Sequence, residues 1–232
     1  MPNSEFSDDQ VLSSWHKNAQ AWTQVVDNGA IPSRKLITDA AIVATVLEYN
    51  PASVLDIGCG EGWLSRKLAG QGIQVCGIDG IAPLVKTASE RAGINESYRQ
   101  FEYQEICAKN LAQKFEVIVC NFSLIGRESV EQIFKNAGEI LHPNGYLIVQ
   151  TLHPYQSCGD ADYLDGWRRG SWEGIAGDFH DAAPWYFRTL ASWLQLFADN
   201  GFVLAALREP KAASLPHPSS LILCGKINAD TD

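Results

Sequence analysis

Short apolar runs alternate with amphipathic segments over most of the chain, and this alternation predicts a sheet covered by helices on both faces. The apolar runs after Pro51 have the length of strands, whereas the segments between them carry apolar residues at helical spacing. The clearest helical segment has Val130, Ile133, Phe134 and Ala137 on one side. We expect strands at 53–57, 73–78, 98–103, 115–122 and 146–152.

The pattern changes near the end of the chain. Thr189 precedes a helical segment that Gly201 can terminate, and two further strands are expected at 202–208 and 220–226. No helix separates these two strands, so they should form an antiparallel hairpin. The predicted fold class is α/β, a doubly wound, mostly parallel seven-stranded sheet with a C-terminal antiparallel hairpin strand.

The first 49 residues have a purely helical pattern. Ser7 and Gln10 have the spacing of a capping box, and Gly29 can end the helix that follows. A second helix is expected after Ser33. We expect residues 1–49 to pack on or cap the site of the main domain at 50–232.

Composition excludes several classes of function. The net charge of −9 disfavours binding to nucleic acid, and no apolar run is long enough to span a membrane. The opening residues "MPNSEFSDDQ" have neither a basic nor an apolar stretch, so no secretory signal is expected. The six cysteines form no CxxC pair, which favours reduced thiols in a cytoplasmic protein. No carboxylate–histidine spacing indicates a metal.

The segment "LDIGCGEGW" places three glycines at the end of the first expected strand. Glycines in such a turn let a ligand approach the backbone closely. Asp56 lies inside this strand, and Asp79 ends the next strand 23 residues later, where a carboxylate can accept both hydroxyls of a ribose. The spacing is GxGxG, whereas a dinucleotide fingerprint requires GxGxxG. A nucleotide-dependent oxidoreductase is therefore disfavoured.

These motifs resemble those of class I S-adenosylmethionine-dependent methyltransferases. The similarity includes "VLDIGCGEGWLSRKLA", "VCGIDG", "FEVIVCNFSL" and "ILHPNGYLIVQTLHP". It implies S-adenosylmethionine as cofactor and S-adenosylhomocysteine as product. It also implies that the methionine portion is held by Asp56 and the turn of Gly58, Cys59, Gly60 and Gly62.

The resemblance implies further contacts with the cofactor. Asp79, Gly80 and Ile81 would hold the ribose, and Glu105 with Ile106 would hold the adenine, although the family more often has Asp at the position of Glu105. Asn121, Phe122 and Ser123 would line the methionine and transfer region.

Residues 153–188 interrupt the alternation of strands and helices and are rich in aromatic residues. A long ordered insertion is usually functional, and we expect it to act as a substrate lid. Its candidates for catalysis or substrate binding are His153, His180, Tyr186 and Arg188. Each has an alternative structural role: His153 can cap the end of the fifth strand, and the other three can hold the insertion together.

The sequence leaves two classes of function open. The favoured class is a methyltransferase acting on a small, aromatic or otherwise planar acceptor, as a monomer or homodimer. The alternative is a protein that binds or senses S-adenosylmethionine without catalysis. The N-terminal helix can either pack on the body through Trp15 and Trp22 or cover the cofactor, with Trp22 or Arg34 touching it.

Overall fold

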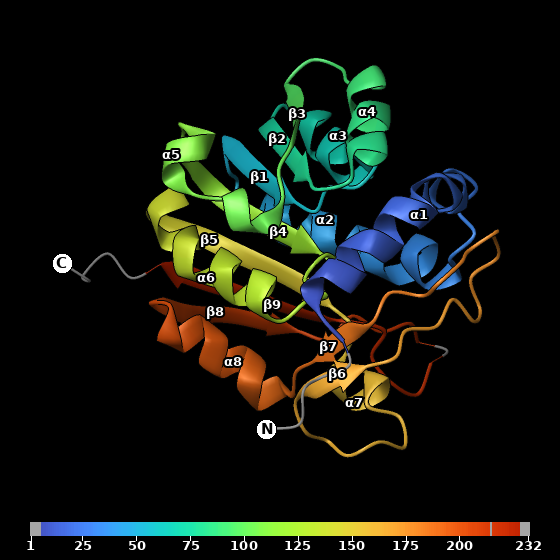
Figure 1. Ribbon diagram of the computed structural model, residues 1–232. Coiled ribbons are helices and arrows are strands. Elements are labelled where there is room, and N and C mark those ends of the chain that lie inside the picture. Colours follow the sequence, from blue (N-terminus) through green and yellow to red (C-terminus); the bar gives the residue numbers. More distant parts are fainter. Residues whose placement is uncertain (1–5, 214, 228–232) are drawn as a thin grey trace.

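The computed structural model describes residues 6–213 and 215–227 and contains a seven-stranded sheet with strand order β3-β2-β1-β4-β5-β9-β8 (Figure 1). Only β9 runs antiparallel to its neighbours β5 and β8. The strands are β1 (Ser53–Ile57), β2 (Gln74–Asp79), β3 (Glu96–Gln100), β4 (Phe115–Asn121), β5 (Leu141–Thr151), β8 (Phe202–Arg208) and β9 (Leu221–Ile227). The predicted fold class is confirmed.

Helices cover both faces of this sheet because its central strands are apolar on both sides. On β4, Val117 and Val119 pack with α2 (Asp39–Glu48) and α3 (Trp63–Ala69). Ile118 and Cys120 face the opposite side, with α6 (Glu128–Ile140) and α8 (Leu190–Asp199). The other helical elements are η1 (Arg34–Thr38), α4 (Ala82–Glu90), η2 (Tyr103–Glu105) and α5 (Ala108–Leu111).

The fifth strand begins at Leu141, five residues before the predicted start at 146. The third strand also differs from its predicted boundaries. It spans Glu96–Gln100 instead of 98–103, and the backbone N–H of Phe101 makes a last bond to the carbonyl of Asp79. The chain then leaves the sheet, and Tyr103 begins the short helix η2. Apolar periodicity missed this end because Phe101 and Tyr103 still pack against the core after the strand has ended.

The N-terminal helix α1 (Asp8–Asp27) is attached at both ends to the main body. Its predicted capping box is present, and the backbone N–H of Ser7 donates to Gln10 at 3.0 Å. At its start, Asp8 accepts two 2.7 Å bonds from the backbone N–H groups of Arg127 and Ser129. At its end, Asp27 accepts two 2.8 Å bonds from Arg91.

The insertion contains regular structure that the sequence did not predict. Helix α7 (Pro154–Ser157) follows β5, and β6 (Gly166–Arg168) pairs with β7 (Trp185–Phe187) in a separate antiparallel sheet. In Figure 1 the chain between β6 and β7 runs up beside α1. Among the described residues, no helix combines the length and apolarity needed to cross a membrane.

Candidate functional site

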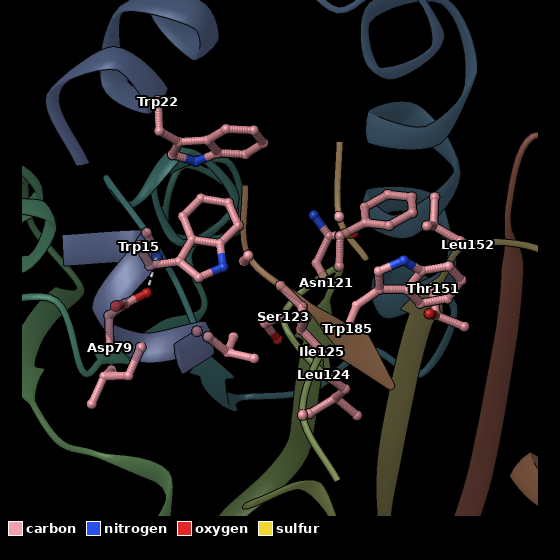
Figure 2. Close-up of a pocket in the computed structure, with 18 of the residues that line it drawn as sticks. Trp15, Trp22, Asp79, Asn121, Ser123, Leu124, Ile125, Thr151, Leu152 and Trp185 are labelled. Atoms are coloured by element: carbon pink, nitrogen blue, oxygen red, sulfur yellow. Dashed lines mark hydrogen bonds between the residues drawn. The ribbon is translucent and has the colours of Figure 1, made fainter. Parts of the chain in front are cut away.

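A cavity of about 500 Å³ opens at the carboxyl ends of β1, β2, β4 and β5 (Figure 2). The strand order reverses between β1 and β4, which is where open α/β sheets bind ligands. The volume lies within the range of small-molecule and cofactor sites, about 300–1,000 Å³. Helix α1, η1 and the insertion all contribute to its walls.

Asp79 joins the two turns that form one end of the cavity. Its carboxylate accepts a 2.9 Å bond from the backbone N–H of Gly60 and another from that of Ile81. Burial raises the pKa of Asp79, and the two N–H donors partly offset this effect. A carboxylate has about four acceptor positions, so Asp79 can accept further bonds from a ligand.

The glycines of the first turn have different roles. Gly58, at φ +72°, is packed so closely that a Cβ would lie 2.3 Å from the Cβ of Ser123. A Cβ on Gly60, at φ +58°, would have Trp22 Nε1 as its nearest neighbour, at 3.8 Å. The backbone at Gly60 is therefore accessible from the cavity. Gly62, at φ +86°, precedes α3 and packs on Tyr98.

Asp56 lies beneath this turn and is not part of the cavity lining. It is 1% exposed and accepts a 2.7 Å bond from the Ser65 hydroxyl of α3. Burial raises the pKa of Asp56 to about 7, although the bond from Ser65 opposes this shift. The Asp56 side chain thus supports the turn from below. Gly62 is also outside the lining.

The structure does not bring Glu105 and Ile106 into the cavity. Glu105 is exposed and accepts a 2.8 Å bond from the backbone N–H of Glu102, while Ile106 is fully buried in the core. The residues that line this side are Glu102, Tyr103 and Gln104. The shift arises because β3 ends at Gln100, so the chain turns toward the cavity earlier than the motif spacing indicated.

The end of β4 and the two residues that follow it line the cavity. Asn121, Phe122 and Ser123 all line it, and Phe122 has the left-handed φ of +53°. The Ser123 hydroxyl donates to the carbonyl of Ile57 at 2.6 Å. The Tyr103 hydroxyl in turn donates to the carbonyl of Ser123 at 3.0 Å.

Aromatic rings from α1 and the insertion meet above the cavity. Trp15 contacts Trp22 and Trp172 edge to face, with ring centroids 5.1 and 5.6 Å apart. Arg34 places its guanidinium 5.7 Å from the ring centre of Trp22 and 4.9 Å from that of Trp63. The sequence raised Trp22 and Arg34 as possible cofactor contacts, and both line the cavity.

The predicted catalytic residues divide into two pairs. His153 and His180 do not line the cavity. His153 Nε2 lies 2.7 Å from Glu209 Oε1, and its Nδ1 accepts a bond from the backbone N–H of Tyr155, so it caps α7. His180 has an exposed side chain, and its backbone bonds to Asn18. Geometry therefore argues against a catalytic role for either histidine.

Tyr186 and Arg188 do line the cavity. The Arg188 guanidinium donates to the carbonyls of Gly126 and Arg127 at 2.9 and 3.0 Å and lies over the rings of Tyr186 and Trp193. Burial lowers the pKa of Arg188. Arg188 thus holds the loop after β4 in place.

Trp15 of the N-terminal helix and Trp172 and Trp185 of the aromatic insertion were noted in the sequence without being predicted as site residues, and all three line the cavity. Other lining residues were not identified from the sequence: Trp63, Leu124, Ile125, Thr151 and Leu152. Thr151 and Leu152 could have been found from their position at the carboxyl end of the fifth expected strand. Nothing in the sequence shows which tryptophans of the insertion face inward. Among the described residues, no group of three or more His, Cys, Asp or Glu side chains is placed to hold a metal.

Comparisons with known proteins place this geometry among methyl-transferring enzymes. A family model described as a methyltransferase domain matches residues 33–207. Ubiquinone biosynthesis O-methyltransferase of Rickettsia canadensis (strain McKiel) is 30% identical over 130 residues, which is 51% of this chain and 54% of that protein. The protein of the same name from Histophilus somni (strain 2336) is 30% identical over 155 residues, 63% of this chain and 64% of that protein. The chain thus spans about half the length of the curated relatives it matches, from 40% to 64%.

Solved structures share the fold. An S-adenosylmethionine-dependent methyltransferase from Mesorhizobium loti superposes with a TM-score of 0.63 at 20% identity, over 75% of this chain and 90% of that one. Magnesium protoporphyrin IX methyltransferase from Synechocystis PCC 6803, with bound S-adenosylhomocysteine, has a TM-score of 0.58 at 19% identity, over 82% of this chain and 81% of that one.

Proposed function

The chain belongs to the class I S-adenosylmethionine-dependent methyltransferase family, and we propose that it transfers a methyl group from that cofactor to a small aromatic acceptor. The observation that carries this proposal is the cradle formed by the bare backbone at Gly60 and the carboxylate of Asp79, at the switch point of the sheet. Both open onto a cavity that continues under aromatic side chains.

The residues of the cavity fit the parts of this cofactor. Asp79 would accept bonds from the ribose hydroxyls, and Glu102 and Gln104 would meet the adenine in place of Glu105 and Ile106. Arg34 would hold the carboxylate of the methionine portion. Its Nε donates to Asp39 at 3.1 Å, which fixes the guanidinium between Trp22 and Trp63.

The aromatic walls support a planar acceptor, because flat rings pack well against Trp15, Trp172 and Trp185. The names of the two relatives as O-methyltransferases support a hydroxyl group as the methylated atom. When bound, S-adenosylmethionine supplies an electrophilic methyl group on a sulfonium.

The chain's own contribution is alignment and exclusion of water. In ideal cases alignment lowers a barrier by about 7–11 kcal/mol. The tryptophans of α1 and the insertion would exclude water from the acceptor. None of the five histidines lines the cavity, so removal of the hydroxyl proton would not depend on a histidine.

A thermal melt with S-adenosylmethionine, S-adenosylhomocysteine and NAD tests the cofactor assignment. Either adenosyl ligand at ~100 times its Kd should stabilise the chain by about 2.7 kcal/mol. Asp79→Asn should abolish this shift while the variant stays folded, because the ribose loses its charged acceptor. Stabilisation by NAD alone, or an unchanged shift in Asp79→Asn, would contradict the proposal.

Transfer of a radiolabelled methyl group to a panel of hydroxylated arenes separates an enzyme from a cofactor-binding protein. Product formation that depends on the acceptor supports catalysis. Ligand-induced stabilisation without transfer to any member of a broad panel would favour the non-catalytic alternative.

A further inference from the structure

Arg91 connects three parts of the molecule that surround the proposed cofactor cradle. It caps the C-terminal end of α4, the helix that follows β2. Its guanidinium donates to both carboxylate oxygens of Asp27, the last residue of α1, at 2.8 Å each. Its Nη1 also lies 3.6 Å from Oε2 of Glu61, which belongs to the glycine turn at residues 58–62.

Glu61 makes this contact part of the glycine turn itself. Its side chain is 1% exposed and contributes to the wall of the cavity. Arg66 of α3 donates to the Glu61 carboxylate at 2.5 Å and to the Glu61 backbone carbonyl at 2.6 Å. A buried carboxylate needs a charged partner, because water no longer solvates it. Arg66 and Arg91 both face this carboxylate, so the glycine turn is attached to α3 and α4.

Helix α1 passes close over the two turns that would hold the cofactor. A Cβ on Gly80, in the turn after β2, would lie 3.2 Å from Leu12 Cδ1. A Cβ on Gly60 would lie 3.8 Å from Trp22 Nε1. Leu12 and Trp22 both line the cavity. One wall of the cradle is therefore a helix, and the place of Trp22 depends on where the end of that helix is held.

The stability of α1 alone does not explain the acid at its end. The backbone carbonyls at the C-terminal end of a helix carry partial negative charge, which disfavours a carboxylate there. The bidentate pair with Arg91 offsets this cost when α1 is docked on α4. Trp22 lies five residues before Asp27, about 7.5 Å along the helix, so a displacement of this end moves the ring.

We propose that Arg91 is a positioning residue for the cofactor: it holds the end of α1 on the glycine turn, keeps Trp22 beside the cradle and so slows release of the bound adenosyl ligand. Arg91 does not line the cavity, and it acts through Asp27 and Glu61. This inference rests on the proposed function, because it concerns retention of the cofactor in the same cradle.

The release rate of S-adenosylhomocysteine, measured by surface plasmon resonance, tests the role of Arg91. Arg91→Met keeps an apolar stem and removes the guanidinium, and it should raise the release rate about five-fold. Lys86→Met is the matched control, because it removes the same charge from the same helix, where Lys86 lies 3.7 Å from Glu90. Its release rate should stay within about two-fold of native. Equal release rates in the two variants would overturn the inference.

Asp27→Asn breaks the same pair from the side of α1 and leaves Glu61 with both arginines. It removes an acid from the C-terminal end of a helix, so α1 itself should not become less stable. Release should nevertheless be at least about three-fold faster than in the native chain. Native release from Asp27→Asn would show that this pair does not retain the cofactor.

Two further measurements separate positioning from a merely structural role. In a Trp22→Ala background, Arg91→Met should not raise the release rate further, because the ring that it positions is gone. The Asp27–Arg91 pair is partly exposed, so salt should screen it. Raising salt from about 50 mM to about 500 mM should accelerate release more in the native chain than in Arg91→Met. A full five-fold effect without Trp22, or equal salt dependence, would contradict the inference.

The outcomes separate this inference from the proposed function. If the native chain binds S-adenosylhomocysteine while Arg91→Met and Asp27→Asn release it as Lys86→Met does, the inference fails and the proposed function stands. If no adenosyl ligand binds the native chain, the proposed function itself fails.

Discussion

Single residues at the site carry structural and binding roles at the same time. Asp79 holds the turns after β1 and β2 together through the N–H groups of Gly60 and Ile81, and the same carboxylate is exposed to the cavity. The turn that a cofactor would touch is therefore already formed in the ligand-free chain. Such pre-organisation reduces the conformational entropy lost on binding.

Asp56 should make stability depend on pH. Its pKa is about 7 in the folded chain against 3.8 for an ordinary Asp, so between these values the folded chain holds a proton that the unfolded chain has lost. Stability should therefore fall as the pH rises through this window, by at most ~1.4 kcal/mol per pH unit, and level off above it. Asp56→Asn keeps an oxygen for the Ser65 hydroxyl and removes the titration. Urea unfolding at pH 5, 6, 7 and 8 should show a flatter profile for the variant; parallel profiles would contradict the shift.

Gly58 and Gly72 provide a matched test of close packing in the first turn. Both have left-handed φ values, +72° and +88°, but a Cβ on Gly72 would meet no atom within 4 Å. Gly72→Ala should cost only the backbone strain, about 1–2 kcal/mol. Gly58→Ala should cost about 1–3 kcal/mol more, because its Cβ overlaps Ser123. Chemical unfolding of both variants measures the difference, and equal losses would show that the turn can relax.

Of the residues predicted at the ends of the first two strands, most line the cavity, whereas Asp56 and Gly62 do not. The glycines could be located because a GxGxG turn exposes its backbone to a ligand. Asp79 could be located because it is the acid at the end of the next strand. The inward-facing residues of the longer loops could not be predicted. Whether Glu102 or Glu105 faces the cavity depends on the strand ending at Gln100, which apolar periodicity does not show.

At the scale of elements, Asn18 connects two segments that cover the cavity. Its side chain donates to the carbonyl of His180 at 2.7 Å and accepts from the N–H of the same residue at 2.8 Å. Ser14 adds a 2.5 Å bond to the carbonyl of Asp181. Helix α1 and the insertion are therefore joined into one cover over the cavity. The sequence predicted that the insertion is a substrate lid and that the N-terminal helices either pack on the body or cap the site. It did not predict their contact, because nothing in the sequence distinguishes Asn18 from other polar residues of the helix.

Asn18→Ala and Lys17→Ala should differ in how strongly they weaken the contact between α1 and the insertion. Asn18 is 1% exposed, and its loss leaves the N–H of His180 without a partner and the carbonyl with only the 3.3 Å bond from Trp172 Nε1, which should cost about 1–3 kcal/mol. Lys17 reaches the same segment through an exposed 2.7 Å ion pair with Asp181, which water screens, so its loss should have little effect on stability.

Amide hydrogen exchange of the insertion tests this difference. Exchange between Gly170 and Ala183 should accelerate in Asn18→Ala and stay close to native in Lys17→Ala. If both variants leave that exchange unchanged, the Asn18 contact does not hold the insertion down.

At the scale of the whole molecule, the fold follows from sequence pattern more directly than the site does. The alternation of apolar strands and helices determined the order of elements, and the missing helix before the last strand determined its antiparallel direction. The small β6–β7 sheet was not predicted because each strand has only three residues and its partner lies far along the chain. Strands this short carry too little periodicity to recognise.

The thiols should report on the integrity of the whole core. All six cysteines are free and all but Cys107 are buried. Burial raises the pKa of the Cys59, Cys76, Cys120 and Cys224 thiols, which lowers the fraction of reactive thiolate. In the native chain a chromogenic disulfide reagent should react fastest with Cys107 and slowly with the others, and in denaturant it should react with all six. Rapid reaction of several thiols in the native chain would show that the core opens readily.

The contact between Asn18 and His180 joins residues 162 positions apart, which affects when the binding site can form during synthesis. The ribosome releases α1 first and the insertion only after β5, so a nascent chain can assemble much of the sheet while the cavity still lacks one side of its cover. A chain terminated before His180 would retain the glycine turn and Asp79 but leave them open to water. Synthesis through the insertion, beyond formation of the first five strands, is therefore the step that gives this chain an enclosed site.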